Sequence, residues 1–422
     1  MERLIFHVDV NSAFLSWEAA RRVKLGEPDL RLIPSCVGGN PDKRTSIVTA
    51  KSIPAKAYGI NTGEPISMAL RKCPDLVIVQ SDFALYESCS KQFKDICRKY
   101  APEVEEFSID ECFLDMTGTG KIYPDPIKTA YDIKNEIRDT LGFTVNVGIG
   151  TNKFLAKMAS DFEKPDKVHT LLTDDEIKQK MWPLPVSDMF GVGKSSAKRL
   201  KEAGLKTIED LAKAEVSFVK LLLGDKIGEH IHLLAQGIDE SPVTSEEREA
   251  KSYSVVTTVE ENIVTYERAN QILLGLADSV ATRMRSEGAK AYCVSVKIRS
   301  NTFNNQSHQV NLTDATDVTK EIYETSIQLF AGLWDGKTPL RLIGIALSNI
   351  TRDSMEQMSL FDNAGREKQK KIDETMDSIR TRYGMDKIVR GSVYKNSMDV
   401  GRKYKAQVQN SIKNSNGCGD CL

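Results

Sequence analysis

Three carboxylates in the first third of the chain have the types and spacing to carry chemistry together. Asp9 follows a short apolar run, and Asp110 and Glu111 are adjacent within an acidic segment. Carboxylate oxygens are the ligands that Mg²⁺ prefers, so the three side chains could form one cation site. Each also has a simpler explanation, because an aspartate at a strand end commonly caps a helix and an Asp-Glu pair in a turn is commonly exposed.

The elements that must position these residues are predicted from periodicity. Residues 4–10 predict a buried strand, which Asn11 and Ser12 follow as residues of helix-capping types before a helix over 13–24. Residues 105–116 predict a strand, a hairpin turn and a second strand. Side chains alternate along a strand, so Asp110 and Glu111 reach one site only if a turn lies there. Further predicted elements are a hairpin over 31–49, helices over 86–100 and 126–141, and a strand over 144–149.

The rest of the chain changes character twice. Residues 171–240 predict short helices joined by tight turns, and the polar segment 241–249 has no periodicity and predicts a linker. Residues 251–350 predict the order strand, helix, strand, strand, helix, strand, with the second and third strands at 292–300 and 307–312. Near the end of the chain, one more helix is predicted around 367–382.

Composition limits the class of protein. The 422 residues are enough for two to four domains, and 40% hydrophobic with 28% charged residues is typical of a globular protein without membrane spans. Eight scattered cysteines predict no disulfide scaffold, and we expect a cytoplasmic chain with reduced thiols. The net charge of −1 is unevenly distributed, because residues 103–115 hold six acids and no base, whereas residues 380–413 hold nine bases.

Four segments carry a specific resemblance. FHVDVNSAF at 6–14 and EFSIDECFLD at 106–115 surround the carboxylates, and TVNVGIGTNK at 144–153 and AKMASD at 156–161 follow in order. In residues, order and spacing the four segments resemble motifs of the Y family of translesion DNA polymerases, most closely the bacterial DNA polymerase IV type. The resemblance runs from about residue 2 to about residue 400.

The resemblance implies an α+β, multidomain right-hand polymerase with an added little-finger domain. The implied domains are a palm over 1–170 with inserted fingers at about 25–75, a thumb over 171–240, a linker over 241–250, a little finger over 251–350 and a tail over 351–422.

The implied activity is template-directed DNA synthesis past damaged bases, with low fidelity and two Mg²⁺ ions per active site. Asp9 and Asp110 would hold both ions, the Val10 carbonyl would be a backbone ligand, and Glu111 would bind the ion that activates the primer 3′-hydroxyl. Two cations roughly 4 Å apart stabilise both the attacking and the leaving oxygen. Without cations the carboxylates would repel, since their own segment contains no base. No 3′→5′ exonuclease motif set is visible, so we expect no proofreading.

The resemblance also implies a nucleotide site. Lys164 matches a lysine that binds the triphosphate, and Thr49 matches a hydroxyl donor. Two positions depart from the family pattern, because Lys56 replaces an arginine and Ile53 replaces a tyrosine. These departures remove the guanidinium group of the arginine, which can bind phosphate through two N–H groups, and the hydroxyl of the tyrosine. They put the affinity for the nucleotide in doubt but not the reaction class.

Phe14 stands where the family has a bulky steric gate beneath the sugar of the nucleotide. Taken alone, a phenylalanine on the first helix would be a core residue, and the motif favours the gate. The backbone N–H groups of Ser12 and Ala13 would bind phosphate at the start of that helix.

Several residues are implied to bind DNA. Gly191, Gly193 and Lys194 resemble a helix–hairpin–helix, an element that holds a DNA phosphate with backbone amides, although a plain turn between helices has the same glycines. Lys251 and Arg299 are candidates for contacts with the template backbone.

A short apolar peptide in the tail resembles the sliding-clamp peptide of bacterial polymerases, and a hydrophobic turn folded on the little finger is the alternative. Its residues are Gln357, Met358, Ser359, Leu360 and Phe361. Cys418 and Cys421 form a weak zinc half-site, because no second pair follows.

The expected partners are primer–template DNA, deoxynucleoside triphosphates and the sliding clamp, with no membrane and with a monomeric chain. Two other functions compete with this interpretation. A nucleotide cyclase uses similar carboxylates but needs neither a DNA grip nor a clamp peptide. A silent DNA-binding accessory protein would not need three carboxylates.

Overall fold

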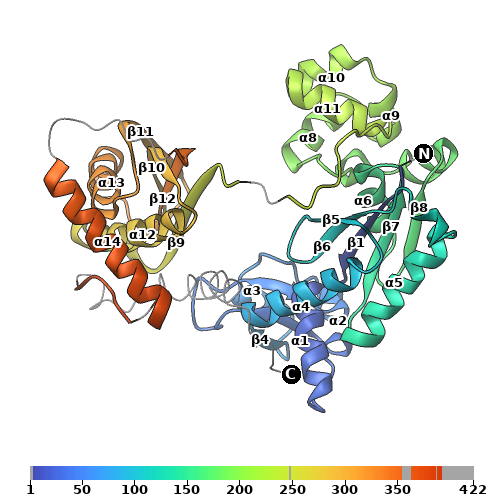
Figure 1. Ribbon diagram of the computed structural model, residues 1–422, viewed down its shortest axis with the longest axis horizontal. Helices are drawn as coiled ribbons and strands as arrows, with labels where there is room; N and C mark the ends of the chain where they lie inside the picture. Colours follow the sequence, from blue (N-terminus) through green and yellow to red (C-terminus); the bar gives the residue numbers. More distant parts are fainter. Residues whose placement is uncertain (1–2, 247–248, 354–362, 386, 392–422) are drawn as a thin grey trace. The chain divides into compact units, whose positions relative to one another are not determined.

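The computed structural model describes residues 3–246, 249–353, 363–385 and 387–391 of the chain. The chain divides into two compact units, one of residues 1–42 and 46–247 and one of residues 43–45 and 248–422 (Figure 1). Within the described residues, no helix has the length and apolar character that a membrane crossing needs. Mixed helices and strands confirm the predicted α+β class.

A five-stranded sheet forms the centre of the first unit. Its strand order is β5-β6-β1-β7-β8, and all neighbours are antiparallel except β7 and β8. The predicted first strand is confirmed, because every residue of β1 is buried. The strands are β5 (Glu103–Glu106), β6 (Glu111–Asp115), β1 (Ile5–Val10), β7 (Val145–Gly150) and β8 (Val168–Leu171).

Alternation along β1 separates a packing face from a polar face. Its even-numbered residues join an apolar core with residues of α1, α4 and α5. On the other face, Ile5 packs with Ala156 of α6, and His7 contacts Ser160 of the same helix. Asp9 therefore lies on the face that α6 covers. The helices are α1 (Ala13–Lys24), α4 (Phe83–Cys97), α5 (Pro126–Leu141) and α6 (Lys153–Asp161).

The start of α1 differs from the expected cap. Ser12 occupies the N-cap position, but its backbone is left-handed with φ of 49°, and its side chain caps no amide. The Asn11 side chain instead bonds to neighbouring elements, including Asn146 at 3.1 Å. The Asn11 side chain is therefore used by the elements around the strand rather than by the helix.

A smaller three-stranded sheet of order β3-β2-β4 lies between α1 and α4 in the sequence, and it contains the hairpin predicted over 31–49. Its strands pack around a separate small apolar core with the helices α2 and α3. These elements are β2 (Ser35–Gly38), β3 (Val48–Lys51), α2 (Ile53–Ala57), α3 (Ile66–Lys72) and β4 (Val77–Gln80).

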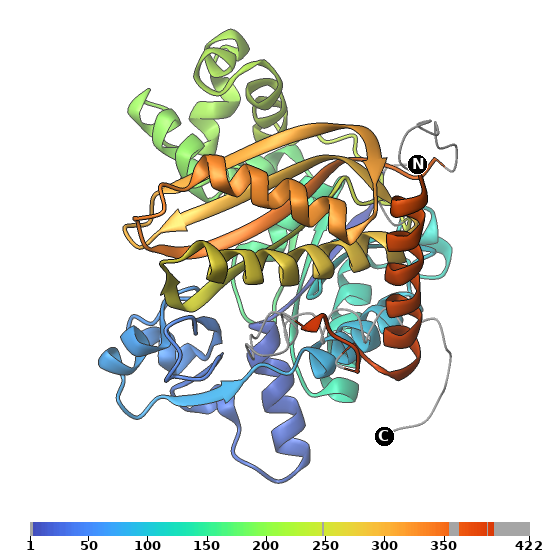
Figure 2. The same ribbon diagram turned by 90° about the vertical axis from the view of Figure 1, so that its left-hand side faces the viewer.

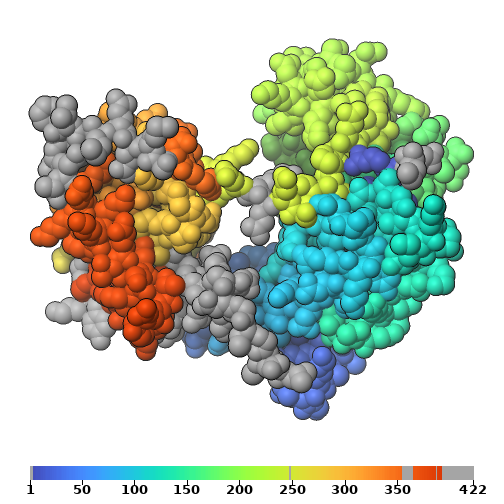
Figure 3. Space-filling view, in the orientation of Figure 1, coloured from blue at the N-terminus to red at the C-terminus, as the bar shows by residue number. Residues whose placement is uncertain are grey.

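Four short helices with tight turns follow the large sheet, as predicted. Their apolar core continues into α6 through Leu155 and Met158. They form a distinct lobe of the first unit (Figures 1 and 3). The helices are α8 (Lys194–Glu202), α9 (Ile208–Lys213), α10 (Val216–Leu223) and α11 (Asp225–Ala235). Shorter helical pieces are Leu30–Leu32, Thr119–Lys121, α7 (Asp174–Glu176), Ile177–Met181 and Val186–Asp188.

The segment predicted as a linker has no regular structure, yet its first residues are bound to the first unit. Val243 is buried, the Thr244 amide donates to Glu105 at 3.2 Å, and the Ser245 amide donates to Glu103 at 2.6 Å. The chain up to residue 245 is therefore anchored to the edge strand β5.

The second unit has the predicted order of strands and helices. Its sheet has the order β11-β10-β12-β9, and α12 and α13 cover one face (Figure 2). The hairpin strands are longer than predicted, and only residues 301–304 connect them. The elements are β9 (Ser252–Ile263), α12 (Tyr266–Ser286), β10 (Lys290–Ser300), β11 (Asn305–Thr316), α13 (Thr319–Leu333) and β12 (Leu340–Thr351).

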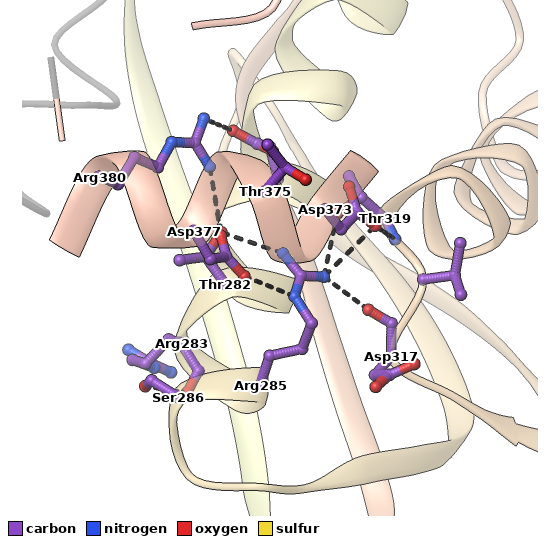
Figure 4. A network of polar contacts seen from close by, with 12 residues as sticks. Thr282, Arg283, Arg285, Ser286, Asp317, Thr319, Asp373, Thr375, Asp377 and Arg380 are labelled. Atoms are coloured by element: carbon purple, nitrogen blue, oxygen red, sulfur yellow. Dashed lines mark hydrogen bonds and ion pairs between the residues drawn. The ribbon is translucent and has the colours of Figure 1, made fainter. Parts of the chain in front are cut away.

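A last helix, α14 (Asn363–Tyr383), confirms the helix predicted around 367–382 and is attached to the second unit by buried ion pairs. Asp373 is 3% exposed, accepts a hydrogen bond from the Thr319 amide at 2.8 Å and another from Arg390 at 2.5 Å. Arg285 of α12 donates to Asp377 at 2.7 Å and lies 3.5 Å from Asp373 (Figure 4). Burial by itself lowers the pKa of Arg285, but these carboxylates outweigh burial and raise it.

We expect Asp373→Ala to loosen α14, because the substitution leaves Arg285 without one of its buried counterions. Removing one partner of a buried ion pair costs about 3–5 kcal/mol. Hydrogen exchange of the α14 amides should accelerate accordingly. The control is Glu374→Ala, an exposed position on the same helix, which should leave exchange unchanged. Equal protection of α14 in both variants would contradict the assigned role of the network.

Candidate active site

A pocket of about 620 Å³ opens beside the end of β1. The end of β1, the start of α1, the segment from β3 to α2, the turn before β6 and the loop after α6 all line it. Ten of the residues singled out in the sequence meet here, namely Asp9, Val10, Ser12, Ala13, Phe14, Thr49, Ile53, Lys56, Asp110 and Lys164.

The strand register explains how the carboxylates meet. Asp9 pairs directly with Glu111 on one side and with Asn146 on the other. Asp110 precedes β6, and its carbonyl accepts a hydrogen bond from the Val10 amide at 2.9 Å. The predicted turn is thus present, and it takes Asp110 out of the alternation of the strand.

The third carboxylate is held differently from the other two. Glu111 is not among the residues that line the pocket, and its carboxylate contacts His7 and Lys157. No group of three or more His, Cys, Asp or Glu side chains in the described ranges is arranged to hold a metal ion. Asp9 and Asp110 thus share the pocket while Glu111 is paired with Lys157, and the cation site of three carboxylates stays a prediction.

Asp9, Asp110 and the Val10 carbonyl nonetheless fit a hard divalent cation by donor type. All three lie at the same pocket and present oxygen atoms, which Mg²⁺ prefers. The carboxylates of Asp9 and Glu111 are paired with the ammonium groups of Lys164 and Lys157. Cation binding would therefore require the lysine contact of Asp9 to give way.

The acidic segment is compensated from other parts of the chain, which corrects the expectation of uncompensated charge. Lysines of α6 and of the loop after it reach Glu105, Glu111 and Asp9, and Lys94 and Arg98 reach Glu106. The pairs are Asp9–Lys164, Glu105–Lys153, Glu106–Lys94, Glu106–Arg98 and Glu111–Lys157.

These contacts shift the protonation of the site in definite directions. Burial raises the pKa of Glu111, but the contacts with His7 and Lys157 outweigh burial and lower the pKa to about 2. Burial lowers the pKa of Lys164, but the charges of Asp9 and Asp161 outweigh burial and raise that pKa. Burial also lowers the pKa of His7. Glu111 and Lys164 are therefore both charged at neutral pH.

A buried pair of asparagines, which the sequence did not indicate, holds the loop that carries Lys164. The side-chain Nδ2 of Asn146 donates to the Ser160 carbonyl at 3.0 Å and to the Glu163 carbonyl at 2.6 Å. Asn11 accepts a hydrogen bond from the Asp166 amide at 2.9 Å. Asn146 lies opposite Asp9 on the neighbouring strand β7, and this position is the signal that could have identified it.

Phe14 has features of a core residue and features of a steric gate. Its ring stacks on Tyr86 with centroids 4.6 Å apart and planes at 13°, and Phe83 packs edge-on at 6.0 Å. The side chain is half-buried and lines the pocket. The aromatic neighbours therefore hold one ring face, while the residue still borders the space beside Asp9.

The other predicted nucleotide residues differ in how free their side chains are. The Thr49 hydroxyl donates to the Val37 carbonyl at 3.0 Å, so its proton is already used. Lys56 lines the pocket and has no hydrogen-bond or ion-pair partner in the part of the chain that the structure describes. Ile53 is 64% exposed at the pocket and supplies no hydroxyl.

The predicted DNA contacts lie on exposed surfaces of each unit. Gly191 has φ of +90°, a conformation that favours glycine, and Gly193 caps the exposed start of α8 at Lys194. Lys251 is exposed just before β9. Arg299 alternates with the core residues of β10, so it lies on the sheet face that α12 and α13 leave open, where its Nε donates to Asn305.

Some sequence features lie outside the described residues or are structural. The clamp-like peptide 357–361 and the pair Cys418 and Cys421 lie outside the described residues. His232 is buried and contacts the Leu211 carbonyl at 3.1 Å, so its role is structural.

Three models of known protein families match the chain. The model of the impB/mucB/samB family matches residues 8–161, and the C-terminal domain of that family matches residues 250–360. The model described as the thumb domain of DNA polymerase-iota matches residues 187–239.

Individual relatives extend over nearly the whole chain. DNA polymerase IV of Clostridium acetobutylicum is 42% identical over 92% of this chain and 98% of its own length. DNA polymerase IV of Clostridium kluyveri is 36% identical over 94% and 100%. DNA polymerase IV 2 of Bacillus subtilis is 34% identical over 96% and 99%. A solved Y-family DNA polymerase chimera, Dbh-Dpo4-Dbh, has the same fold, with a TM-score of 0.70, 23% identity and coverage of 83% of this chain and 100% of the chimera.

The fold and the family matches define a multidomain polymerase with a thumb and a little-finger-like domain. The chain belongs to the Y family of DNA polymerases, in the DNA polymerase IV type, and is a DNA-directed DNA polymerase.

Proposed function

We propose that the chain copies DNA past damaged template bases by two-metal nucleotidyl transfer, with low fidelity and without proofreading. One observation carries this proposal, namely that Asp9, Asp110, Phe14 and Lys164 line one pocket. Its substrates are primer–template DNA and deoxynucleoside triphosphates. Primer extension with Mg²⁺ is the direct test, since neither a cyclase nor a silent accessory protein extends a primer.

The proposed domains follow the predicted boundaries. The five-stranded sheet and its helices would be the palm within 1–170, and the three-stranded sheet the fingers at about 25–75. Helices α8–α11 would be the thumb within 171–240. Residues 251–350 would be the little finger, reached through the linker over 241–250 and followed by a tail over 351–422.

Asp9, Asp110 and the Val10 carbonyl are the proposed ligands of two Mg²⁺ ions. When bound, the ions supply stabilisation of the attacking and leaving oxygens of the displacement. Glu111 would serve the ion nearest the primer 3′-hydroxyl, and its low pKa keeps it an anion at neutral pH. Lys164, now paired with Asp9, would move to the triphosphate as a cation takes its place.

The nucleotide would lie between the fingers and the start of α1. The first amides of a helix have no partner within the helix, so the N–H groups at Ser12 and Ala13 suit phosphate oxygens. Lys56 has a free ammonium group for the same purpose. Thr49 would have to give up its contact with Val37 in order to donate to phosphate. Phe14 would exclude a 2′-hydroxyl by its volume.

The DNA grip is proposed at two surfaces. Gly191, Gly193 and Lys194 would hold a phosphate at the exposed start of α8. Lys251 and Arg299 would contact the template backbone from the second unit. Contacts of this kind position DNA without reading its sequence, which suits a polymerase that copies any template.

The catalytic carboxylates are tested by Asp110→Asn and Glu111→Gln. Either substitution should abolish primer extension and leave primer–template affinity nearly unchanged, because the charge count at the cations falls while the DNA grip lies elsewhere. The matched control is Asp115→Asn on the same strand, where the amide oxygen can still accept from the Thr117 amide. Primer extension at the wild-type rate by either active-site variant would contradict the assignment of Asp110 and Glu111 as catalytic carboxylates.

The gate is tested by Phe14→Ala. Removing the ring should raise the use of ribonucleotides relative to deoxyribonucleotides on the order of 10²-fold, measured by single-nucleotide insertion. A purely structural Phe14 would instead cost about 3–5 kcal/mol of stability without changing sugar choice. Phe83→Ala is the control, because it removes another ring of the same aromatic cluster.

The clamp peptide is tested by replacing Leu360 and Phe361 with Ala. The double variant should lose clamp-stimulated synthesis and keep its basal activity on short templates, since apolar anchors commonly contribute about 2 kcal/mol or more each. A pull-down with the sliding clamp measures binding directly. Equal capture of the wild type and the double variant would show that the peptide has another role.

A further inference from the structure

The carboxylate of Glu111 is held by only one of its two oxygens. Lys157 donates to Oε2 at 2.5 Å, and His7 Nε2 lies 3.1 Å from the same oxygen, at an angle outside that of an aligned hydrogen bond. Oε1 has no hydrogen-bond or ion-pair partner among the residues that the structure describes. The protein therefore fixes one oxygen and leaves the other available.

The orientation of His7 is set from behind by Ser160. The Ser160 hydroxyl oxygen lies 2.8 Å from the Lys157 carbonyl and 2.8 Å from His7 Nδ1, and its one proton can be donated to either atom. An ionised carboxylate only accepts, so His7 can hold Oε2 of Glu111 only with its proton on Nε2, and Nδ1 then accepts from the Ser160 hydroxyl. The ring is completely buried and packs on Phe113 with centroids 4.6 Å apart, which leaves it little freedom to turn.

Two glycines of β7 make this arrangement possible. A Cβ atom on Gly148 would lie 2.0 Å from the Ala156 carbonyl and 2.4 Å from the Ser160 amide, and one on Gly150 would lie 2.5 Å from the Ala156 amide. Only glycine lets α6 approach the sheet so closely. Gly148 is also the register partner of His7, so the helix reaches His7 over the glycine.

We propose that His7 and Ser160 are positioning residues that, together with Lys157, hold Oε2 of Glu111 and leave Oε1 free for a divalent cation. The inference rests on the proposed role of Glu111 in cation binding. Carboxylates that bind metal ions are commonly held in place by hydrogen bonds from surrounding residues. His7 would touch neither DNA nor nucleotide and would act only through Glu111.

The test uses the full chain with primer–template DNA and Mn²⁺ as the probe. His7→Phe keeps the ring and removes both polar contacts, and Ser160→Ala removes only the hydroxyl that orients the ring. Both should weaken Mn²⁺ binding, measured by electron paramagnetic resonance, by about 10- to 100-fold. The single-turnover insertion rate should fall in parallel, while nucleotide KM and primer–template affinity stay unchanged.

Two further variants separate positioning from folding. His7→Gln restores a polar group that can reach Glu111 and should recover part of the Mn²⁺ affinity. His232→Phe is the matched control, since it alters another buried histidine and should leave Mn²⁺ binding unchanged. If His7→Phe does not fold, Ser160→Ala carries the test by itself.

The outcomes distinguish this inference from the proposed function. Wild-type Mn²⁺ binding and insertion in Ser160→Ala and His7→Phe, beside an inactive Glu111→Gln, would overturn the positioning role alone. A Glu111→Gln variant that extends primers at the wild-type rate would instead overturn the proposed function of Glu111, on which the inference depends.

Discussion

The first unit depends on how closely α6 can approach the sheet. At Gly148 and Gly150 the helix backbone occupies the space where side chains of β7 would lie. The close approach brings Lys157 and Ser160 within hydrogen-bond distance of Glu111 and His7 on the neighbouring strands. A larger residue at either glycine would push the helix away and separate these contacts. The polar face of β1 is thus organised by a packing constraint.

The second consequence of this packing is charge balance. An acidic segment with no base of its own would be unstable as a cluster, because like charges in a partly buried site repel. Here α6 and the loop after it supply the compensating lysines at Asp9, Glu105 and Glu111. These contacts leave Oε1 of Glu111 and Oδ2 of Asp110 without a hydrogen-bond partner among the described residues, while Oδ1 of Asp110 accepts from the Ser108 hydroxyl. The proposed cations would enter a site whose charge is already balanced by movable ammonium groups.

In the second unit, the arginine–aspartate pairs around the last helix are buried instead of lying beside a pocket. Its last helix is attached through buried arginine–aspartate pairs, with Asp373 and Arg380 each at most 4% exposed. Buried pairs of this kind add little net stability compared with apolar packing, but they are costly to break and therefore fix one arrangement of the helix. The ion pairs of the first unit sit beside an open pocket, whereas those around α14 are closed off by packing.

Local pattern determined much of this protein. The apolar run at 4–10, the helix at 126–141 and the strand–helix order of 251–350 follow from periodicity, and the structure confirms them. The meeting of Asp9 and Asp110 at one pocket could also be anticipated, because Asp9 ends a strand and Asp110 sits in a hairpin turn. These features depend on neighbours within a few residues in the sequence.

Only the tertiary structure decided which charges meet and which side chains are free. Lys157 and His7 are 150 residues apart in the chain, and nothing in either segment indicates that both contact Glu111. The Thr49 hydroxyl matched a family donor, yet a neighbouring strand takes its proton. The segment after residue 241 has the composition of a linker, but the backbone amides of Thr244 and Ser245 donate to Glu105 and Glu103 of the edge strand β5. Hydrogen bonds and ion pairs act over about 3 Å in space, whereas sequence patterns report only on neighbours along the chain, so such contacts are set by the packing of distant elements.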